Sequence, residues 1–187
     1  LNSQPSNSAN LTSICAAQLT AEAINHVQFD CVVIYFPKSK PEFAYSINNL
    51  FNHVKIDAPV YLVGDNKGGI KSCEKLLQPF CGKANKIDAA KHCALYQTHL
   101  VQASKPFVMA DWFKSYPLSI KNVDLTIYSL PGVFSFGAMD AGTRLLLDNI
   151  EPTTNKTNET PQSILDFGCG AGIIGAFVAK LNEKLND

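Results

Sequence analysis

The chain lacks an excess of charge of either sign. Its 16 basic residues balance 16 acidic ones, so the formal net charge at pH 7 is zero, and Arg144 is its sole arginine. Overall charge therefore gives the chain no electrostatic attraction to nucleic acid, although a local cluster of lysines is compatible with this balance.

Sequence features that would direct the chain to a membrane or bind a metal are also missing. No apolar run approaches the roughly 20 residues that span a bilayer, and residues 1–10 lack the basic start and apolar core of a signal peptide. The six cysteines include no C-x-x-C pair, which argues against a zinc site and against a compact disulfide framework. We expect a cytoplasmic monomer with free thiols, no bound metal and no membrane partner.

The first half of the chain alternates strand-like and helix-like segments. Two apolar runs rich in β-branched residues predict strands buried on both faces of a parallel sheet. Apolar residues at helical spacing predict two helices, the first with Ser39 as its N-cap. The order β-α-β-α-β-β predicts an α/β fold with helices on both faces of the sheet. The predicted strands are 31–36, 59–64, 84–87 and 93–101, and the predicted helices are 39–54 and 67–77.

The second half begins with a loosely patterned stretch, 104–121, for which a short helix and loop are expected. The segments predicted after it are a strand at 125–130, a loop at 131–137, a helix at 140–150, a polar connector at 152–162, a strand at 163–167 and a helix at 173–181. Asp140 is placed to cap the first of these helices. We expect a domain over 1–103, a linker over 104–123, and the start of a second domain over 124–187.

The most informative motif is Asp166-Phe167-Gly168-Cys169-Gly170-Ala171-Gly172. Its glycines allow a tight turn from strand to helix and let a ligand approach the backbone, where the free N-H groups of the next helix are also offered. The spacing is G-x-G-x-G, which disfavours a nicotinamide-binding Rossmann loop with its G-x-G-x-x-G. The D-x-G-C-G-x-G form is typical of class I methyltransferases that bind S-adenosylmethionine.

Further segments resemble the ribosomal RNA small subunit methyltransferase C family, in the order that the family has them. They are Tyr35–Glu42, Val63–Gly69, Lys86–Cys93, Leu130–Ser135, Asp140–Leu147 and Leu165–Gly172. The resemblance implies methyl transfer from S-adenosylmethionine to the exocyclic N2 of a guanine in small-subunit (16S) rRNA. It also implies two tandem class I methyltransferase-like domains, of which the first has lost cofactor binding. The residues it assigns to the cofactor are Asp166, Gly168, Cys169, Gly170, Gly172, Phe134 and Asp140.

The N-P-P-[FY] loop with which that family orients the guanine amino group has no counterpart in the sequence. No catalytic residue is therefore assigned, and we expect the chain alone to be inactive, contributing substrate recognition or assisting folding. One alternative is a non-catalytic module that binds rRNA or a ribosomal protein, and another is a methyltransferase that acts on large-subunit rRNA.

Lysines follow the first two predicted strands of the chain, at the end of the sheet where α/β proteins bind ligands. They are Lys38, Lys40, Lys67 and Lys71. A basic rim for RNA and an ordinary solvated surface are both compatible with them. Tyr35-Phe36-Pro37-Lys38 is favoured as a plain strand terminus over a relic active site.

Overall fold

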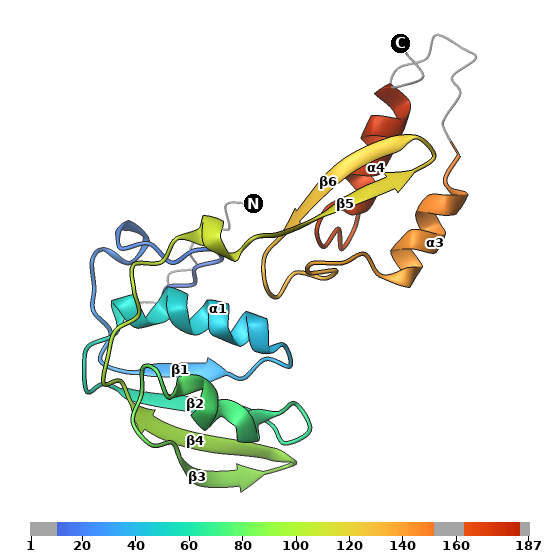
Figure 1. The fold of residues 1–187 in the computed structure, drawn as a ribbon. Coiled ribbons are helices and arrows are strands. Elements are labelled where there is room, and N and C mark those ends of the chain that lie inside the picture. The colour runs from blue at the N-terminus through green and yellow to red at the C-terminus, as the bar shows by residue number, and fades with distance from the viewer. Residues whose placement is uncertain (1–10, 152–162, 184–187) are drawn as a thin grey trace. The chain divides into compact units, whose positions relative to one another are not determined.

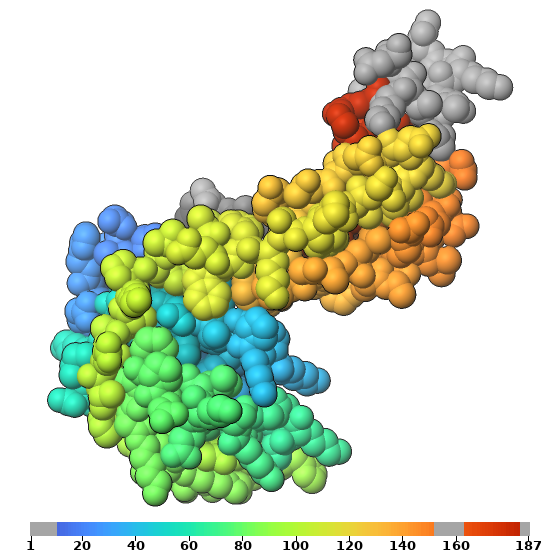
Figure 2. Space-filling view, viewed as in Figure 1, coloured from blue at the N-terminus to red at the C-terminus, as the bar shows by residue number. Residues whose placement is uncertain are grey.

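The computed structural model describes residues 11–151 and 163–183, which are coloured by residue number in Figure 2, and the chain divides into two compact units. Unit 1 is Leu1–Met109 and unit 2 is Ala110–Asp187. Unit 1 contains a four-stranded sheet and unit 2 a two-stranded sheet (Figure 1). The polar connector predicted over 152–162 lies outside the described residues.

The sheet of unit 1 has the strand order β1-β2-β4-β3. Its strands are β1 (Val32–Tyr35), β2 (Pro59–Asp65), β3 (Asn85–Ala90) and β4 (Cys93–His99). β1 and β2 are parallel, whereas β4 runs antiparallel to both β2 and β3, so the prediction of a parallel sheet is wrong for the last two strands. The cause is the two-residue turn between β3 and β4, where Lys91 and His92 have φ of 47° and 66°. Two positive φ values in a row produce the tight turn that favours an antiparallel hairpin.

Residues 11–109 of unit 1 also contain two α-helices and three short 3₁₀ turns. They are η1 (Glu22–Ile24), α1 (Lys40–Leu50), η2 (Phe51–His53), η3 (Ile70–Ser72) and α2 (Cys73–Leu77). The predicted N-cap is confirmed, because the Ser39 side chain accepts a hydrogen bond from the Glu42 amide at 3.3 Å. The second predicted helix is correct in place but shorter than expected, since its first turn is the 3₁₀ turn η3.

One face of the sheet in unit 1 carries the core. Both helices contribute to this core, with Phe43 and Ile47 from α1 and Cys73 and Leu77 from α2, and both pack against the same strand face. The prediction of helices on both faces is therefore wrong for the described residues. Along β1 only Ile34 is buried, so the expectation that this strand is buried on both faces is also wrong.

The described part of unit 2 contains a hairpin and two α-helices. Its elements are η4 (Met109–Trp112), which crosses the boundary from unit 1, and then β5 (Lys114–Ile120), β6 (Val123–Ser129), α3 (Ala141–Asn149) and α4 (Ile173–Glu183). Leu118, Ile120, Val123 and Ile127 from the hairpin form a core with Leu147 of α3 and Ile173, Phe177 and Leu181 of α4. β5 lies where a short helix and loop were expected. Pro117 obscured this strand in the sequence, yet a two-stranded hairpin tolerates proline because both strands are edges.

The strand predicted at 163–167 does not form. These residues have no strand assignment, and Leu165 and Phe167 are 86% and 95% exposed. A strand needs a neighbour for its backbone N-H and C=O groups, and the described strands of unit 2 pair with each other. The helix predicted after the glycine turn is confirmed as α4.

Candidate functional site

The glycine loop before α4 has a backbone conformation that is favourable only for glycine. Gly168, Gly170 and Gly172 have φ of 76°, 55° and 72°, in the left-handed region that side-chain-bearing residues avoid. The turn is closed by a hydrogen bond from the Gly172 amide to the Cys169 carbonyl at 2.8 Å. The alternating glycines of the motif therefore have a direct conformational cause.

The loop leaves space beside its backbone. A Cβ placed at Gly168 or Gly172 would meet none of the described atoms within 4 Å. Gly168, Cys169 and Gly170 are all exposed, and the loop leads directly into the first turn of α4. A polar ligand can thus approach the main chain here without displacing a side chain.

Asp166 anchors this loop to the helix that follows it. One of its carboxylate oxygens accepts a hydrogen bond from the Gly175 amide at 3.2 Å. Gly175 lies in the first turn of α4, where backbone amides have no partner within the helix and where a negative charge is favoured. Asp166 therefore has a structural role as a cap on the first turn of α4.

Phe134 lies against the glycine loop although it is far from it in sequence. A Cβ at Gly170 would come within 3.3 Å of both the Cβ and the carbonyl oxygen of Phe134. The Phe134 side chain is 66% exposed, so it borders the loop without being buried under it. The loop between β6 and α3 and the glycine loop therefore form one surface.

Asp140 organises the other end of the β6–α3 loop. Its carboxylate accepts hydrogen bonds from the Thr143 hydroxyl at 2.6 Å, the Thr143 amide at 3.0 Å and the Ser135 hydroxyl at 2.9 Å. These bonds, with the Thr143 hydroxyl first, lower the pKa of the Asp140 carboxyl to about 2. The predicted N-cap of α3 is therefore confirmed. The Asp140 carboxylate is stabilised by hydrogen bonds from its own loop and helix.

Tyr116 was not singled out in the sequence, yet it belongs to this region. Its hydroxyl is buried and has no hydrogen-bond partner among the described residues. Burial and the nearby Asp140 charge both raise the pKa of this phenol. The alternating pattern of β5 was the available signal, and Pro117 beside it concealed that pattern.

Replacing Asp140 with alanine should lower the melting temperature of unit 2 by a few degrees at pH 7, because the cap of α3 is lost. The folded-state pKa of Asp140 is depressed, so its contribution is present above about pH 4 and is lost as the pH falls through about 2. Thermal unfolding of wild type and variant across this pH range measures the effect.

Two control variants show whether the loss of stability comes from the missing cap or from the loss of any carboxylate on α3. Asp140→Asn should keep most of the stability, because asparagine is also a good N-cap. Asp148→Ala removes a carboxylate of the same helix that only pairs with Arg144 at the surface, and it should change little. An Asp140→Ala protein that melts with the wild type at pH 7 would contradict this account.

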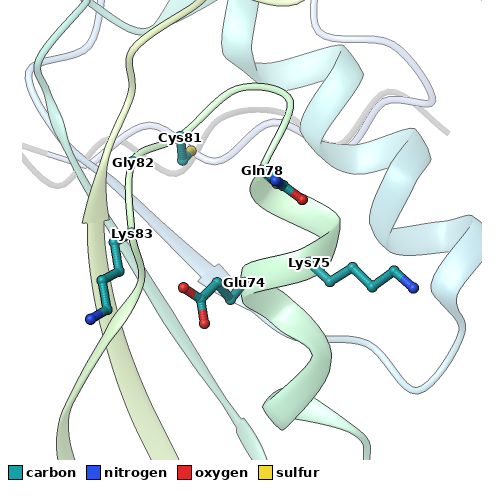
Figure 3. A pocket seen from close by; sticks show the side chains of 6 residues that line it. All are labelled: Glu74, Lys75, Gln78, Cys81, Gly82 and Lys83. Carbon is teal, nitrogen blue, oxygen red and sulfur yellow. The ribbon is translucent and has the colours of Figure 1, made fainter.

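Surface cavities in the described part of the chain include three in unit 1. The one in Figure 3 has a volume of about 450 Å³ and is lined by Glu74, Lys75, Gln78, Cys81, Gly82 and Lys83. Burial raises the pKa of the Cys81 thiol to about 12, so it stays protonated and is no nucleophile. Within the described residues we find no group of three or more potential metal ligands and no helix long and apolar enough to cross a membrane.

The structure brings together most of the residues that the sequence assigned to the cofactor. Asp166, Gly168, Cys169, Gly170 and Gly172 form the loop, and Phe134 contacts it. Asp140 is linked to the same β6–α3 loop through Ser135. A glycine turn of this shape at the start of a helix in an α/β protein is the feature expected of a class I methyltransferase.

Comparison with known families identifies that class. Residues 3–116 match the family described as methyltransferase small domain N-terminal, and residues 124–186 match the methyltransferase small domain. The chain belongs to the methyltransferase small domain N-terminal family.

Individual relatives carry the name that the sequence resemblance suggested. Ribosomal RNA small subunit methyltransferase C of Psychromonas ingrahamii is 42% identical over 159 residues, covering 85% of this chain and 44% of that protein. The protein of the same name from Vibrio parahaemolyticus is 40% identical over 158 residues, covering 84% and 44%. The resemblance to this family is confirmed, and the chain spans less than half the length of these relatives.

A solved structure shows the same fold. It is the T. thermophilus 16S rRNA N2 G1207 methyltransferase in complex with AdoMet and guanosine, with a TM-score of 0.54 and 22% identity over 65% of this chain and 33% of that one. The predicted α/β, class I methyltransferase-like fold is confirmed, apart from the placement of helices corrected above.

Proposed function

We propose that this chain is part of an enzyme that transfers a methyl group from S-adenosylmethionine to the exocyclic N2 of a guanine in small-subunit rRNA, in the cytoplasm. The observation that carries the proposal is the loop Asp166–Gly172, with three left-handed glycines and a carboxylate anchored on α4. The names of the relatives support methyl transfer to small-subunit rRNA.

The proposed cofactor site is the surface formed by the glycine loop and Phe134. The open space at Gly168 and Gly172 fits a ligand that lies along the backbone. We assign the main chain of Gly168, Cys169, Gly170 and Gly172 to the methionyl and ribose side of S-adenosylmethionine, with Asp166 holding the loop in shape. The cofactor supplies an electrophilic methyl group on its sulfonium. Phe134 borders the loop, and Asp140 positions Phe134 through the Ser135 contact.

The two halves of the chain have different proposed roles. Residues 1–103 form a degenerate methyltransferase-like domain for substrate recognition or folding assistance, 104–123 connect the domains, and 124–187 open the catalytic one. β5 shows that part of the connecting stretch pairs with the second domain. A loop that orients the guanine amino group is needed for the transfer step, and the sequence contains no N-P-P-[FY] motif. We therefore propose that the chain alone is inactive, and the expectation that it is a monomer stays a prediction.

The test is a chimaera in which this chain replaces the matching segment of the Psychromonas ingrahamii protein. Methyl transfer from tritiated S-adenosylmethionine is measured on small and large ribosomal subunits, with nucleoside analysis of the product. We expect the chimaera to form N2-methylguanosine in small-subunit rRNA and the chain alone to transfer no methyl group.

Three results would contradict this proposal. A chimaera that folds but transfers no methyl group would mean that this chain does not take part in the reaction. Labelling of large-subunit rRNA alone would favour the alternative that the substrate is large-subunit rRNA. Transfer by the isolated chain would show that the guanine is oriented by residues already present in it.

A further inference from the structure

The sheet of unit 1 has a second face that no described helix covers, because α1 and α2 both pack on the other face. The register places two rows of side chains on this open face, Val33-Tyr61-Gln97 and Tyr35-Val63-Leu95. Val33 and Tyr35 are exposed and the other four are half-buried. We call these six residues the open face.

Tyr35 is the most exposed member of the open face. It lies at the carboxyl end of β1 with 82% of its surface accessible. Tyr61 lies on the neighbouring strand, where its hydroxyl accepts a hydrogen bond from the Gln97 amide at 3.3 Å. The open face thus presents the largely accessible ring of Tyr35. The ring of Tyr61, on the next strand, is held in place by its hydrogen bond with Gln97.

Five lysines gather at the end of the sheet where Tyr35 lies. The register aligns Tyr35 with Val63, and Asp65 with Cys93, so the loops after β1 and β2 and the β3–β4 turn share one end of the sheet (Figure 1). A hydrogen bond from the Asn66 amide to the His92 carbonyl at 2.9 Å joins two of them. We call the lysines on these three segments, and on the adjoining first turns of α1 and η3, the lysine edge; they are Lys38, Lys40, Lys67, Lys71 and Lys91.

The lysine edge is cationic despite the neutral chain. All five lysines are exposed, and none takes part in the salt bridges seen between described residues. Three carboxylates come near the same end, Glu42, Asp65 and Asp88. Asp65 accepts a hydrogen bond from the Lys67 amide at 2.8 Å and Asp88 from the Ala89 amide at 2.7 Å. The lysines therefore outnumber the nearby acids and keep their charges available.

We propose that the open face and the lysine edge bind single-stranded RNA, with a base stacked on Tyr35 and phosphates on the lysines. Exposed aromatic rings on a sheet flanked by cations suit this ligand, since a ring stacks on any base and lysines neutralise the backbone. The proposal builds on the proposed function, because the RNA would be the rRNA substrate, and it adds a contact surface in the unit without the cofactor loop.

The test is the affinity of the full chain for a fluorescein-labelled single-stranded RNA of about 12 nucleotides, measured by anisotropy over a range of salt concentrations. Tyr35→Ala should weaken binding roughly 5- to 150-fold, the range for loss of one stacked base, and Tyr35→Phe should restore it. Lys38→Ala with Lys67→Ala should reduce the slope of log affinity against log salt by about 1.4.

Two controls separate this surface from general charge and from the cofactor site. Lys55→Ala removes an exposed lysine paired with Asp30 away from the lysine edge, and it should bind like the wild type. Gly170→Ala disturbs the cofactor loop and should leave the RNA affinity of the chain unchanged. The same change should lower methyl transfer by the chimaera, so failure of the cofactor site and failure of RNA binding are distinguishable. Equal affinities for all variants, or no binding by the wild type at about 50 mM salt, would overturn the proposal.

Discussion

Replacing Phe177 with alanine should destabilise unit 2 by about 3–5 kcal/mol, the usual cost of removing a fully buried phenylalanine. Phe177 has no exposed surface and lies on α4 in the core formed with Val123, Ile127 and Leu147. Small domains are stable by only about 5–15 kcal/mol in total. The substitution should therefore remove a large share of the stability of unit 2 and make its opening much more frequent.

Hydrogen exchange read by mass spectrometry measures this effect on the β5–β6 hairpin and on α4. The matched control is Phe167→Ala, ten residues earlier, whose ring is 95% exposed. That change should alter the free energy of unfolding by no more than about 0.5 kcal/mol. Equal loss of protection in the two variants would mean that Phe177 does not hold this core together.

Replacing Gly170 with alanine should reduce methyl transfer by the chimaera about 10²-fold or more, the cost of a displacement near 1 Å in a catalytic assembly. The residue has a φ of 55°, which costs about 1–2 kcal/mol once a Cβ is present. The new Cβ would also lie 3.3 Å from two atoms of Phe134. Strain and crowding together should shift the loop away from its present shape.

Two other glycines show whether the effect is specific. Gly175→Ala lies within α4, where the added Cβ would be 3.6 Å from Asp166, an ordinary contact, so activity should be kept. Gly168→Ala introduces the same backbone strain, but the space around its Cβ is open. Its loss of methyl-transfer activity should therefore be smaller than that of Gly170→Ala. Equal activity of all three variants would separate the loop from the reaction. The steady-state ratio kcat/KM of each folded variant is the quantity to compare.

The sequence predicted the glycine loop well because its conformation is local. Glycine permits the left-handed backbone at 168, 170 and 172, and the cap that Asp140 places on α3 joins residues three apart in the chain. The contact between Phe134 and Gly170 joins residues far apart in the chain. The family resemblance assigned both residues to the cofactor and did not predict that they touch.

The predictions that proved wrong concern strand burial and strand pairing, which depend on contacts between distant parts of the chain. An apolar run such as 31–36 reads as buried on both faces, but whether a face is covered depends on where the helices pack, and here both pack on the other side. The segment 163–167 has strand composition, yet the described strands of unit 2 offer it no pairing partner. Lys91-His92 and Lys121-Asn122 form hairpin turns without glycine, so the usual turn signals were missing.

Binding of S-adenosylmethionine to the loop Asp166–Gly172 can be observed residue by residue in a nuclear magnetic resonance titration of this chain. Amide signals are followed as the cofactor is added up to millimolar concentrations. We expect saturable shifts at Gly168, Cys169, Gly170 and Gly172 and in the first turn of α4, with weak affinity and no response in Gly170→Ala. Unmoved loop amides, or shifts confined to unit 1, would contradict this expectation.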